Sequence, residues 1–369
     1  MRWDLFCNVI DNYGDAGVCW RLARGLALAG ESVRLWTDAP DVQRWMAPEG
    51  CTGVSLVDWT DEAAVDAAAA GHAPDVLVEA FGCEPAPALV HAFAQRARSA
   101  RHTAAWINLE YLSAEPYVER LHTLPSPVFK GPGEGLVKHF FYPGFTPRTG
   151  GLLREPGLAG RQAVFDRRTW LEALGVAWKG EWVVSLFCYE PRGLPELLAQ
   201  WVSGDTPILL LVTFGRAAAA VRAALSGMDG VTHAGSRSGI GMLSIVFLPL
   251  LTQIGFDELL WSSDFNFVRG EDSLVRAIWA GKPFAWQIYP QDDDAHHVKL
   301  DALLDAIDAP ASLRQFHAAW NATTDAPPRW PDAATHGTWK AALRSAQVRL
   351  AAQDDLVTQL RGFVHRLAA

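Results

Sequence analysis

The chain has 369 residues and a formal net charge of -9, from 32 basic and 41 acidic side chains. Half of its residues are hydrophobic and 20% are charged, which is typical of soluble proteins with complete cores. This acidic balance, without any run of Lys and Arg, argues against a nucleic-acid binder and against a polybasic membrane anchor. The five scattered cysteines form no CxxC pair and predict neither a disulfide framework nor a zinc site.

The longest apolar runs fall far short of the ~20 residues that span a bilayer. The first residues include an acid where a signal peptide would have its apolar core. We therefore expect a cytoplasmic protein that has no membrane partner and, from the charge pattern, no nucleic-acid partner.

Short apolar runs alternate with helical patterns in both halves of the chain. The predicted strands are Leu5–Ile10, Ser32–Thr37, Val76–Ala80, Thr103–Leu109, Trp182–Cys188, Ile208–Phe214, Ser244–Leu248, Phe265–Val268 and Pro283–Ile288. Two successive blocks of this kind predict two doubly wound α/β domains, which also suits the length at ~150 residues per domain.

The first half ends in a Pro- and Gly-rich tract, and we interpret Gly150–Gly160 as the passage between the domains. The domains are then expected at 1–155 and 160–344. The last stretch, Thr338–Ala368, is predicted to be helical throughout. Its end, about 345–369, is able to pack back on the first domain.

Two acids, Asp11 and Asp15, follow the first strand and precede a helical pattern that begins at Val18. Loops at the carboxyl ends of strands are where such folds bind ligands. Acids there favour a cationic ligand or the activation of a nucleophile, while the alternative is that Asp15 only caps the helix.

A second acidic turn, Arg269–Ser273, follows the predicted strand Phe265–Val268 and precedes a helix from Leu274. Arg269, the Ser273 hydroxyl and the positive helix N-terminus are suited to a diphosphate. Glu271 and Asp272 would then face a sugar or an acceptor. The alternative is a plain helix cap.

Aromatic and amide side chains also follow strands in the second half. Phe247, Gln253 and Phe256 offer an aromatic face for stacking and an amide for the edge of a nucleobase, although taken alone they fit core packing better. Tyr189 could reach a phosphate, and the alternative is a half-buried tyrosine. Neither GxGxxG after the first strand nor GxxxxGK[ST] is present. The segment Gln291–His297 is interpreted as a solvated helix start and not as a metal site.

Several long motifs together resemble one family. They are Val-Ile-Asp-Asn-Tyr-Gly-Asp-Ala-Gly-Val-Cys-Trp-Arg-Leu-Ala-Arg (9–24), Ser-Leu-Phe-Cys-Tyr-Glu (185–190), Phe-Val-Arg-Gly-Glu-Asp-Ser (267–273), Trp-Ala-Gly-Lys-Pro-Phe (279–284) and Ile-Tyr-Pro-Gln (288–291). This pattern is similar to that of the bacterial protein-arginine rhamnosyltransferases of elongation factor P, the EarP family. The resemblance runs from near residue 3 to the C-terminal helix.

The resemblance implies a GT-B fold, with two Rossmann-like domains facing across a cleft. It also implies inverting, metal-independent transfer of L-rhamnose from dTDP-β-L-rhamnose to an arginine of elongation factor P, with no cofactor. The acceptor protein would bind the N-terminal domain and the donor nucleotide the C-terminal one.

By matching motifs, the resemblance assigns catalytic roles to Asp11, Asp15 and Glu271. The donor-binding residues that it implies are Tyr189, Phe247, Gln253, Phe256, Arg269, Asp272 and Ser273. Three alternatives remain: a GT-B enzyme acting on a small-molecule or lipid acceptor, a non-catalytic sugar-nucleotide sensor, and a sugar-nucleotide epimerase.

Overall fold

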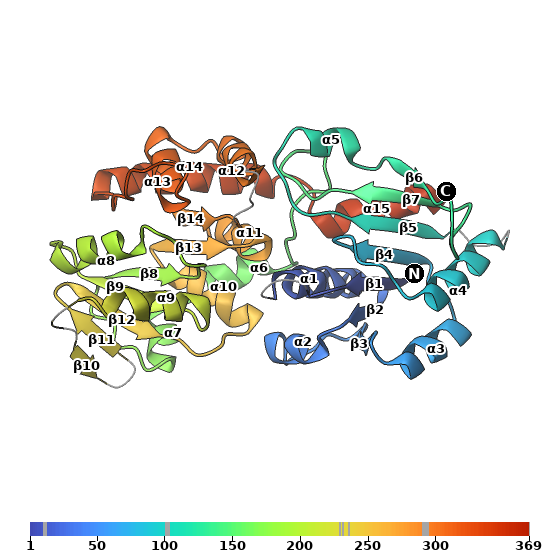
Figure 1. Ribbon diagram of the computed structural model, residues 1–369, viewed down its shortest axis with the longest axis horizontal. Coiled ribbons are helices and arrows are strands. Elements are labelled where there is room, and N and C mark those ends of the chain that lie inside the picture. Colours follow the sequence, from blue (N-terminus) through green and yellow to red (C-terminus); the bar gives the residue numbers. More distant parts are fainter. Residues whose placement is uncertain are drawn as a thin grey trace. The chain divides into compact units, whose positions relative to one another are not determined.

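The computed structural model describes residues 1–9, 13–99, 104–228, 230, 232–234, 237–289 and 295–368. They form two compact units (Figure 1). Unit 1 comprises residues 1–156 and 350–369, and unit 2 comprises residues 157–349. The boundary between Pro156 and Gly157 falls inside the Pro- and Gly-rich passage. Within the described ranges, no helix combines the length and the apolar character needed to cross a membrane.

Unit 1 is built on a sheet with the order β3-β2-β1-β4-β5-β7-β6, in which only β6 is antiparallel to its neighbour. Its strands are β1 (Arg2–Cys7), β2 (Ser32–Thr37), β3 (Val54–Asp58), β4 (Val76–Ala80), β5 (Ala105–Leu109), β6 (Pro125–Pro127) and β7 (Val137–Phe141). The chain leaves β1 toward β2 on one side and reaches β4 on the other. The gap between the loops that follow β1 and β4 is therefore the topological switch point, where doubly wound sheets bind ligands.

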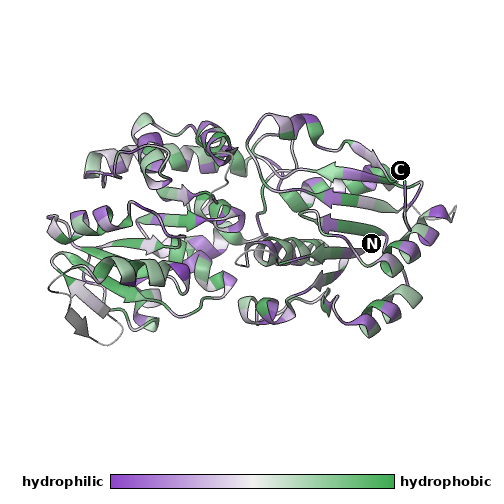
Figure 2. Ribbon diagram, viewed as in Figure 1, coloured by the Kyte–Doolittle hydropathy of each residue, from purple (hydrophilic) through white to green (hydrophobic). Residues whose placement is uncertain are grey.

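Helices cover both faces of this sheet. They are α1 (Gly14–Leu28), α2 (Pro40–Met46), α3 (Glu62–Ala70), α4 (Pro87–Arg98), α5 (Tyr117–Leu121) and α15 (Leu356–Ala368). On one face Leu22 of α1 and Leu360 of α15 share a core with the strands, and on the other Phe93 of α4 packs edge-to-face on Trp106. Because the sheet is buried on both faces, its central strands are mostly apolar, as Figure 2 shows.

The C-terminal stretch was predicted as a single helix, and this prediction is wrong. Two helices form, α14 (Ala333–Ala351) and α15. The break occurs because Asp355 accepts the backbone N–H groups of Val357 (3.0 Å) and Thr358 (3.2 Å), which starts a new helix. The red helix α15 in Figure 1 thereby returns to unit 1 and contacts α1 and β5, while most of α14 belongs to unit 2.

Unit 2 contains a sheet with the order β10-β11-β12-β9-β8-β13-β14. Its strands are β8 (Trp182–Leu186), β9 (Ile208–Val212), β10 (Thr232–Ala234), β11 (Arg237–Ile240), β12 (Leu243–Phe247), β13 (Phe265–Arg269) and β14 (Phe284–Gln287). Five neighbouring strands of this sheet, β12, β9, β8, β13 and β14, are parallel. Their bounds match the predicted strands to within two residues at each end. Their order places the switch point of unit 2 between the loops after β8 and β13.

The helices of unit 2 connect these strands or pack on them. They are α6 (Leu158–Ala163), α7 (Arg167–Ala173), α8 (Leu194–Ser203), α9 (Arg216–Leu225), α10 (Gln253–Ser262), α11 (Glu271–Ala280), α12 (Ala295–Ala306), α13 (Ala311–Trp320) and α14. A buried ion pair joins two of them, since Arg276 of α11 donates to Asp257 of α10 at 2.7 Å and 2.9 Å. This pair fixes α11 against α10, because breaking a buried pair leaves an uncompensated charge.

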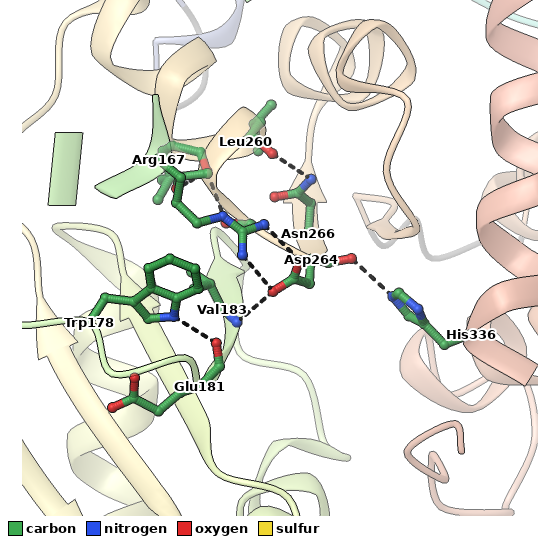
Figure 3. A network of polar contacts seen from close by, with 11 residues as sticks. Arg167, Trp178, Glu181, Val183, Leu260, Asp264, Asn266 and His336 are labelled. Carbon is green, nitrogen blue, oxygen red and sulfur yellow. Dashed lines mark hydrogen bonds and ion pairs between the residues drawn. The ribbon is translucent and has the colours of Figure 1, made fainter. Parts of the chain in front are cut away.

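A polar network holds the amino ends of β8 and β13 together (Figure 3). The carboxylate of Asp264, just before β13, accepts from the Arg167 guanidinium at 2.6 Å and 3.1 Å and from the Val183 N–H at 3.0 Å. The Asp264 carbonyl lies 3.0 Å from Nε2 of His336. These side chains stabilise the amino ends of the strands. The loops at the opposite, carboxyl ends are the ones available for a ligand.

Candidate functional site

The acidic turn of unit 1 begins where β1 ends at Cys7. The helix starts at Gly14 and not at Val18, with Tyr13 at the N-cap position in a left-handed conformation (φ 70°) and no side-chain cap. Asp15 is half-buried in the first turn of α1. The interpretation of Asp15 as the N-cap is therefore wrong, and its carboxylate lies where the helix dipole stabilises negative charge. The other predicted acid, Asp11, lies outside the described residues.

The second acidic turn lies at the switch point of unit 2. It is almost entirely helical, because β13 runs to Arg269, Gly270 is the sole link and α11 begins at Glu271. Gly270 has a φ of 65°, a conformation that favours glycine, and its carbonyl accepts from the Trp286 indole N–H at 2.9 Å. The chain thus turns sharply enough to bring Arg269 and the N-terminus of α11 together.

Two aromatic rings pack against the guanidinium of Arg269. Its Cζ lies 4.4 Å from the centre of the Tyr189 ring and 4.6 Å from that of Phe187, both in the loop after β8. The Cζ of Arg216, the first residue of α9, lies 4.8 Å from the same Tyr189 ring. A guanidinium stacked on rings keeps its planar donors in a fixed orientation, which suits an anion with several oxygens. We call Phe187, Tyr189, Arg216 and Arg269 the arginine–aromatic cluster.

Further contacts fix this cluster in place. The Tyr189 N–H donates to Oε1 of Gln287 at 2.8 Å, and Arg216 Nε donates to the Glu190 carboxylate at 2.8 Å. The hydrogen bond from Arg216 lowers the pKa of Glu190 below its usual value. The Arg216 charge is therefore partly balanced. Arg269 is buried in the cluster.

The acidic turn positions its own polar side chains. The Ser273 hydroxyl accepts from the Arg269 N–H at 3.1 Å and donates to the Arg269 carbonyl, so it orders the Arg269 backbone. Glu271 accepts from Lys299 Nζ of α12 at 2.8 Å. Asp272 is half-buried in the same first turn.

The three residues predicted to contact a base occupy two elements. Gln253 and Phe256 belong to α10 and not to a loop, because Thr252 caps this helix by accepting from the Gly255 N–H at 3.1 Å. The Phe256 ring packs edge-to-face on Phe187 at 5.3 Å, which connects it to the arginine–aromatic cluster. Phe247 ends β12 and lies against the Arg222 guanidinium, 4.2 Å from Cζ to ring centre.

Four residues with contacts to the predicted site were missed: Phe187, Arg216, Lys299 and Gln287. Arg216 begins the helix after β9, so the rule that pointed to Arg269 would have found it. Among the described residues, no group of three or more His, Cys, Asp or Glu is arranged to hold a metal ion. Most of the segment Gln291–His297 lies outside the described ranges.

Comparison with known proteins identifies the family. Residues 3–365 match the family described as Elongation-Factor P (EF-P) rhamnosyltransferase EarP. The chain belongs to the EarP family. It is therefore an enzyme, a glycosyltransferase of the protein-arginine rhamnosyltransferase type, which rules out the non-catalytic sensor and the epimerase.

Relatives of this EarP-family chain cover between 82% and 98% of it. The protein-arginine rhamnosyltransferase of Pseudomonas putida KT2440 is 42% identical, over 98% of both chains. That of Pseudomonas aeruginosa PAO1 is 42% identical, over 87% of both chains. That of Neisseria meningitidis H44/76 is 37% identical, over 82% of this chain and 77% of the relative. This similarity supports the motif-based resemblance.

Solved structures show the fold. One that explains EarP-mediated arginine glycosylation of translation elongation factor EF-P is 32% identical, with a TM-score of 0.65 and 99% coverage of both chains. Spinosyn forosaminyltransferase SpnP, at 13% identity and a TM-score of 0.51, shares the fold over the full length of both chains. The EarP-family chain thus has the predicted GT-B fold, built from two Rossmann-like units.

Proposed function

We propose that this enzyme transfers L-rhamnose from dTDP-β-L-rhamnose to one arginine side chain of translation elongation factor P, with inversion and without a metal ion. The family match supports the reaction class. The observation that carries the proposal for the donor is the stacked Arg269 guanidinium beside the N-terminus of α11. A translation factor as acceptor also implies that the reaction takes place in the cytoplasm.

The donor diphosphate would bind to the arginine–aromatic cluster. Arg269 and Arg216 supply two guanidinium groups, and the N-terminus of α11 adds roughly half a positive charge. Phe256 and Gln253 at the start of α10 would hold the base by stacking and by reading its edge. Phe247, at the end of β12, remains a donor-binding candidate. So does Asp272, which would lie beside the diphosphate.

The acceptor imposes the main energetic problem, because a guanidinium has a pKa near or above 12.5 and is a poor nucleophile when protonated. Removing its proton outright at neutral pH costs about 8 kcal/mol for six pH units. Carboxylates reduce this cost by pairing with the guanidinium and by accepting its proton as the new bond forms. Asp15 is our choice for this general base.

In the reaction, a guanidinium nitrogen attacks C1 of rhamnose while the bond from C1 to the diphosphate oxygen breaks. The electron pair of that bond goes to the diphosphate, and the nitrogen proton goes to Asp15. Attack opposite the leaving group inverts the configuration. Asp11 would orient the guanidinium, and Glu271, held by Lys299, would approach from the donor side.

The leaving group carries growing negative charge, which the guanidiniums of Arg269 and Arg216 and the helix N-terminus would stabilise. This positive charge comes from the protein itself and supports the proposal that the transfer needs neither a metal ion nor a cofactor.

Intact-mass spectrometry tests the proposal. Purified elongation factor P is incubated with the enzyme, dTDP-β-L-rhamnose and EDTA, and we expect its mass to rise by one deoxyhexose. A matched incubation of elongation factor P with UDP-glucose should leave its mass unchanged. An unmodified factor, with transfer to a lipid or small molecule instead, would contradict the proposal.

A further inference from the structure

The loops at and beside the switch point of unit 1 carry side chains that the proposed chemistry does not use. Phe81 directly follows β4, the neighbour of β1, and Glu110 and Tyr111 directly follow β5, the next strand. Neighbouring strands lie about 4.8 Å apart, so the carboxyl ends of β4 and β5 lie about 5 Å and about 10 Å from that of β1, the strand that precedes Asp15.

The backbone of Phe81 is held in an unusual conformation. Its φ is 58°, in the left-handed region that bulky residues rarely adopt. A hydrogen bond of 2.8 Å from its N–H to the Leu109 carbonyl fixes this turn against β5. Such outliers persist where surrounding structure enforces them and are concentrated at functional sites.

The enforced turn places Phe81 flat against Tyr111. The two rings stack with centres 4.5 Å apart and planes 16° apart, and Tyr111 remains 39% exposed. A supported, partly exposed tyrosine ring is a rigid platform for a flat or cationic group.

A carboxylate directly precedes Tyr111 in the chain. Glu110 is half-buried and accepts from the Asn108 amide at 3.0 Å. Burial raises the pKa of Glu110. The pKa of Tyr142 is raised to about 12, mainly by the burial of Tyr142 and then by the nearby charge of Glu110. A cation beside Glu110 would offset the desolvation of the carboxylate.

We propose that Phe81, Glu110 and Tyr111 form an acceptor subsite that binds a second, positively charged side chain of the acceptor protein close to the target arginine. The inference rests on the proposed function. Glu110 would repel the anionic donor, which favours the acceptor as occupant. A separation of about 5–10 Å corresponds to two or three residues of extended chain, so the bound side chain lies within about three residues of the target.

Steady-state kinetics with the full-length enzyme and purified elongation factor P tests the subsite. Tyr111→Ala and Glu110→Gln should each raise KM for the acceptor about tenfold, the effect of losing one well-placed contact, with kcat within about twofold of wild type. Tyr111→Phe keeps the ring and should restore the wild-type KM. Phe129→Ala, at an 83% exposed aromatic of the same unit, is the matched control and should change nothing.

Two further measurements separate a subsite from a general effect. Donor affinity by calorimetry and the thermal midpoint should be unchanged in Tyr111→Ala and Glu110→Gln. On an acceptor whose nearby basic side chain is replaced by alanine, Glu110→Gln should cause no additional loss. Wild-type KM in both variants, or a loss of donor affinity, would overturn the subsite. Failure of the wild-type enzyme to modify the factor would instead overturn the proposed function.

Discussion

The guanidinium carbon of Arg269 lies 4.4 Å from the centre of the Tyr189 ring, although 80 positions separate the two residues in the chain. The contact exists because β13 pairs with β8, so that the loops after these strands meet at the switch point of unit 2. The ring fixes the orientation of the guanidinium, and this orientation, as well as its charge, should matter for donor binding.

Arg269→Lys tests the importance of orientation. Lysine keeps the charge but loses the planar stack and the fixed donors, so we expect donor binding to weaken by about 1–2 kcal/mol. Isothermal titration with dTDP measures this change. Arg168→Lys, at a guanidinium above Trp178 in the same unit, is the matched control. Equal dTDP affinity in Arg269→Lys and wild type would show that charge alone suffices.

Asp15→Asn tests the assignment of the general base. The amide keeps the shape of the side chain but cannot accept the proton, so we expect dTDP-rhamnose binding to persist and transfer to fall about 10²–10⁴-fold. Single-turnover assays with saturating donor measure the transfer step. Asp41→Asn, at an exposed acid of α2, should retain activity. Near-normal turnover of Asp15→Asn would remove Asp15 from the mechanism.

Phe256→Ala tests base stacking. Loss of the ring should weaken donor binding by about 1–3 kcal/mol, the scale of one base stacked on an aromatic side chain. The contact between Phe256 and Phe187 predicts that the effect extends to the diphosphate. A titration with dTDP and with inorganic pyrophosphate separates the two contributions. If dTDP binds Phe256→Ala as tightly as wild type, the stacking role is wrong.

His317 makes the stability of unit 2 dependent on pH. It is fully buried in α13, its Nε2 accepts from the Trp286 N–H at 3.1 Å, and burial lowers its pKa from 6.5 to about 4. Between these two values the unfolded state binds more protons. The contribution of His317 to the free energy of unfolding should therefore be fully present above pH 6.5. It should decrease as the pH falls toward 4.

The expected contribution of His317 is a loss of about 2 kcal/mol between about pH 7 and about pH 5. Urea unfolding of wild type and of His317→Gln at both pH values measures it, because the glutamine variant should lack this part of the pH dependence. His365→Gln changes an exposed histidine and should behave as wild type. An identical decrease in all three proteins would contradict the assignment.

Much of the fold follows from local patterns. Apolar residues identify β2 and β4 to the residue, because the strands of a sheet that is covered on both faces are rich in them. The start of α1 was missed because Gly14 is a weak helix former, so the local pattern favoured a turn at this position. The cap at Asp355 could have been predicted, because Asp is a common residue at helix starts. It was missed because residues that favour helix lie on either side of it.

The site was less predictable than the fold. Arg269 could be predicted because it lies at the carboxyl end of a strand. Its sandwich between Phe187 and Tyr189 could not, because strand order is decided by long-range pairing and not by local pattern. The engagement of the Ser273 hydroxyl with the Arg269 backbone likewise depends on where β13 ends.

A crystal structure of the enzyme with dTDP and elongation factor P tests the central claim most directly. The claim predicts the diphosphate against Arg269 and the first turn of α11, and the guanidinium of the target arginine against the carboxylate of Asp15. A nucleotide bound away from Ser273, or an Asp15 that makes no contact with the acceptor arginine, would contradict it.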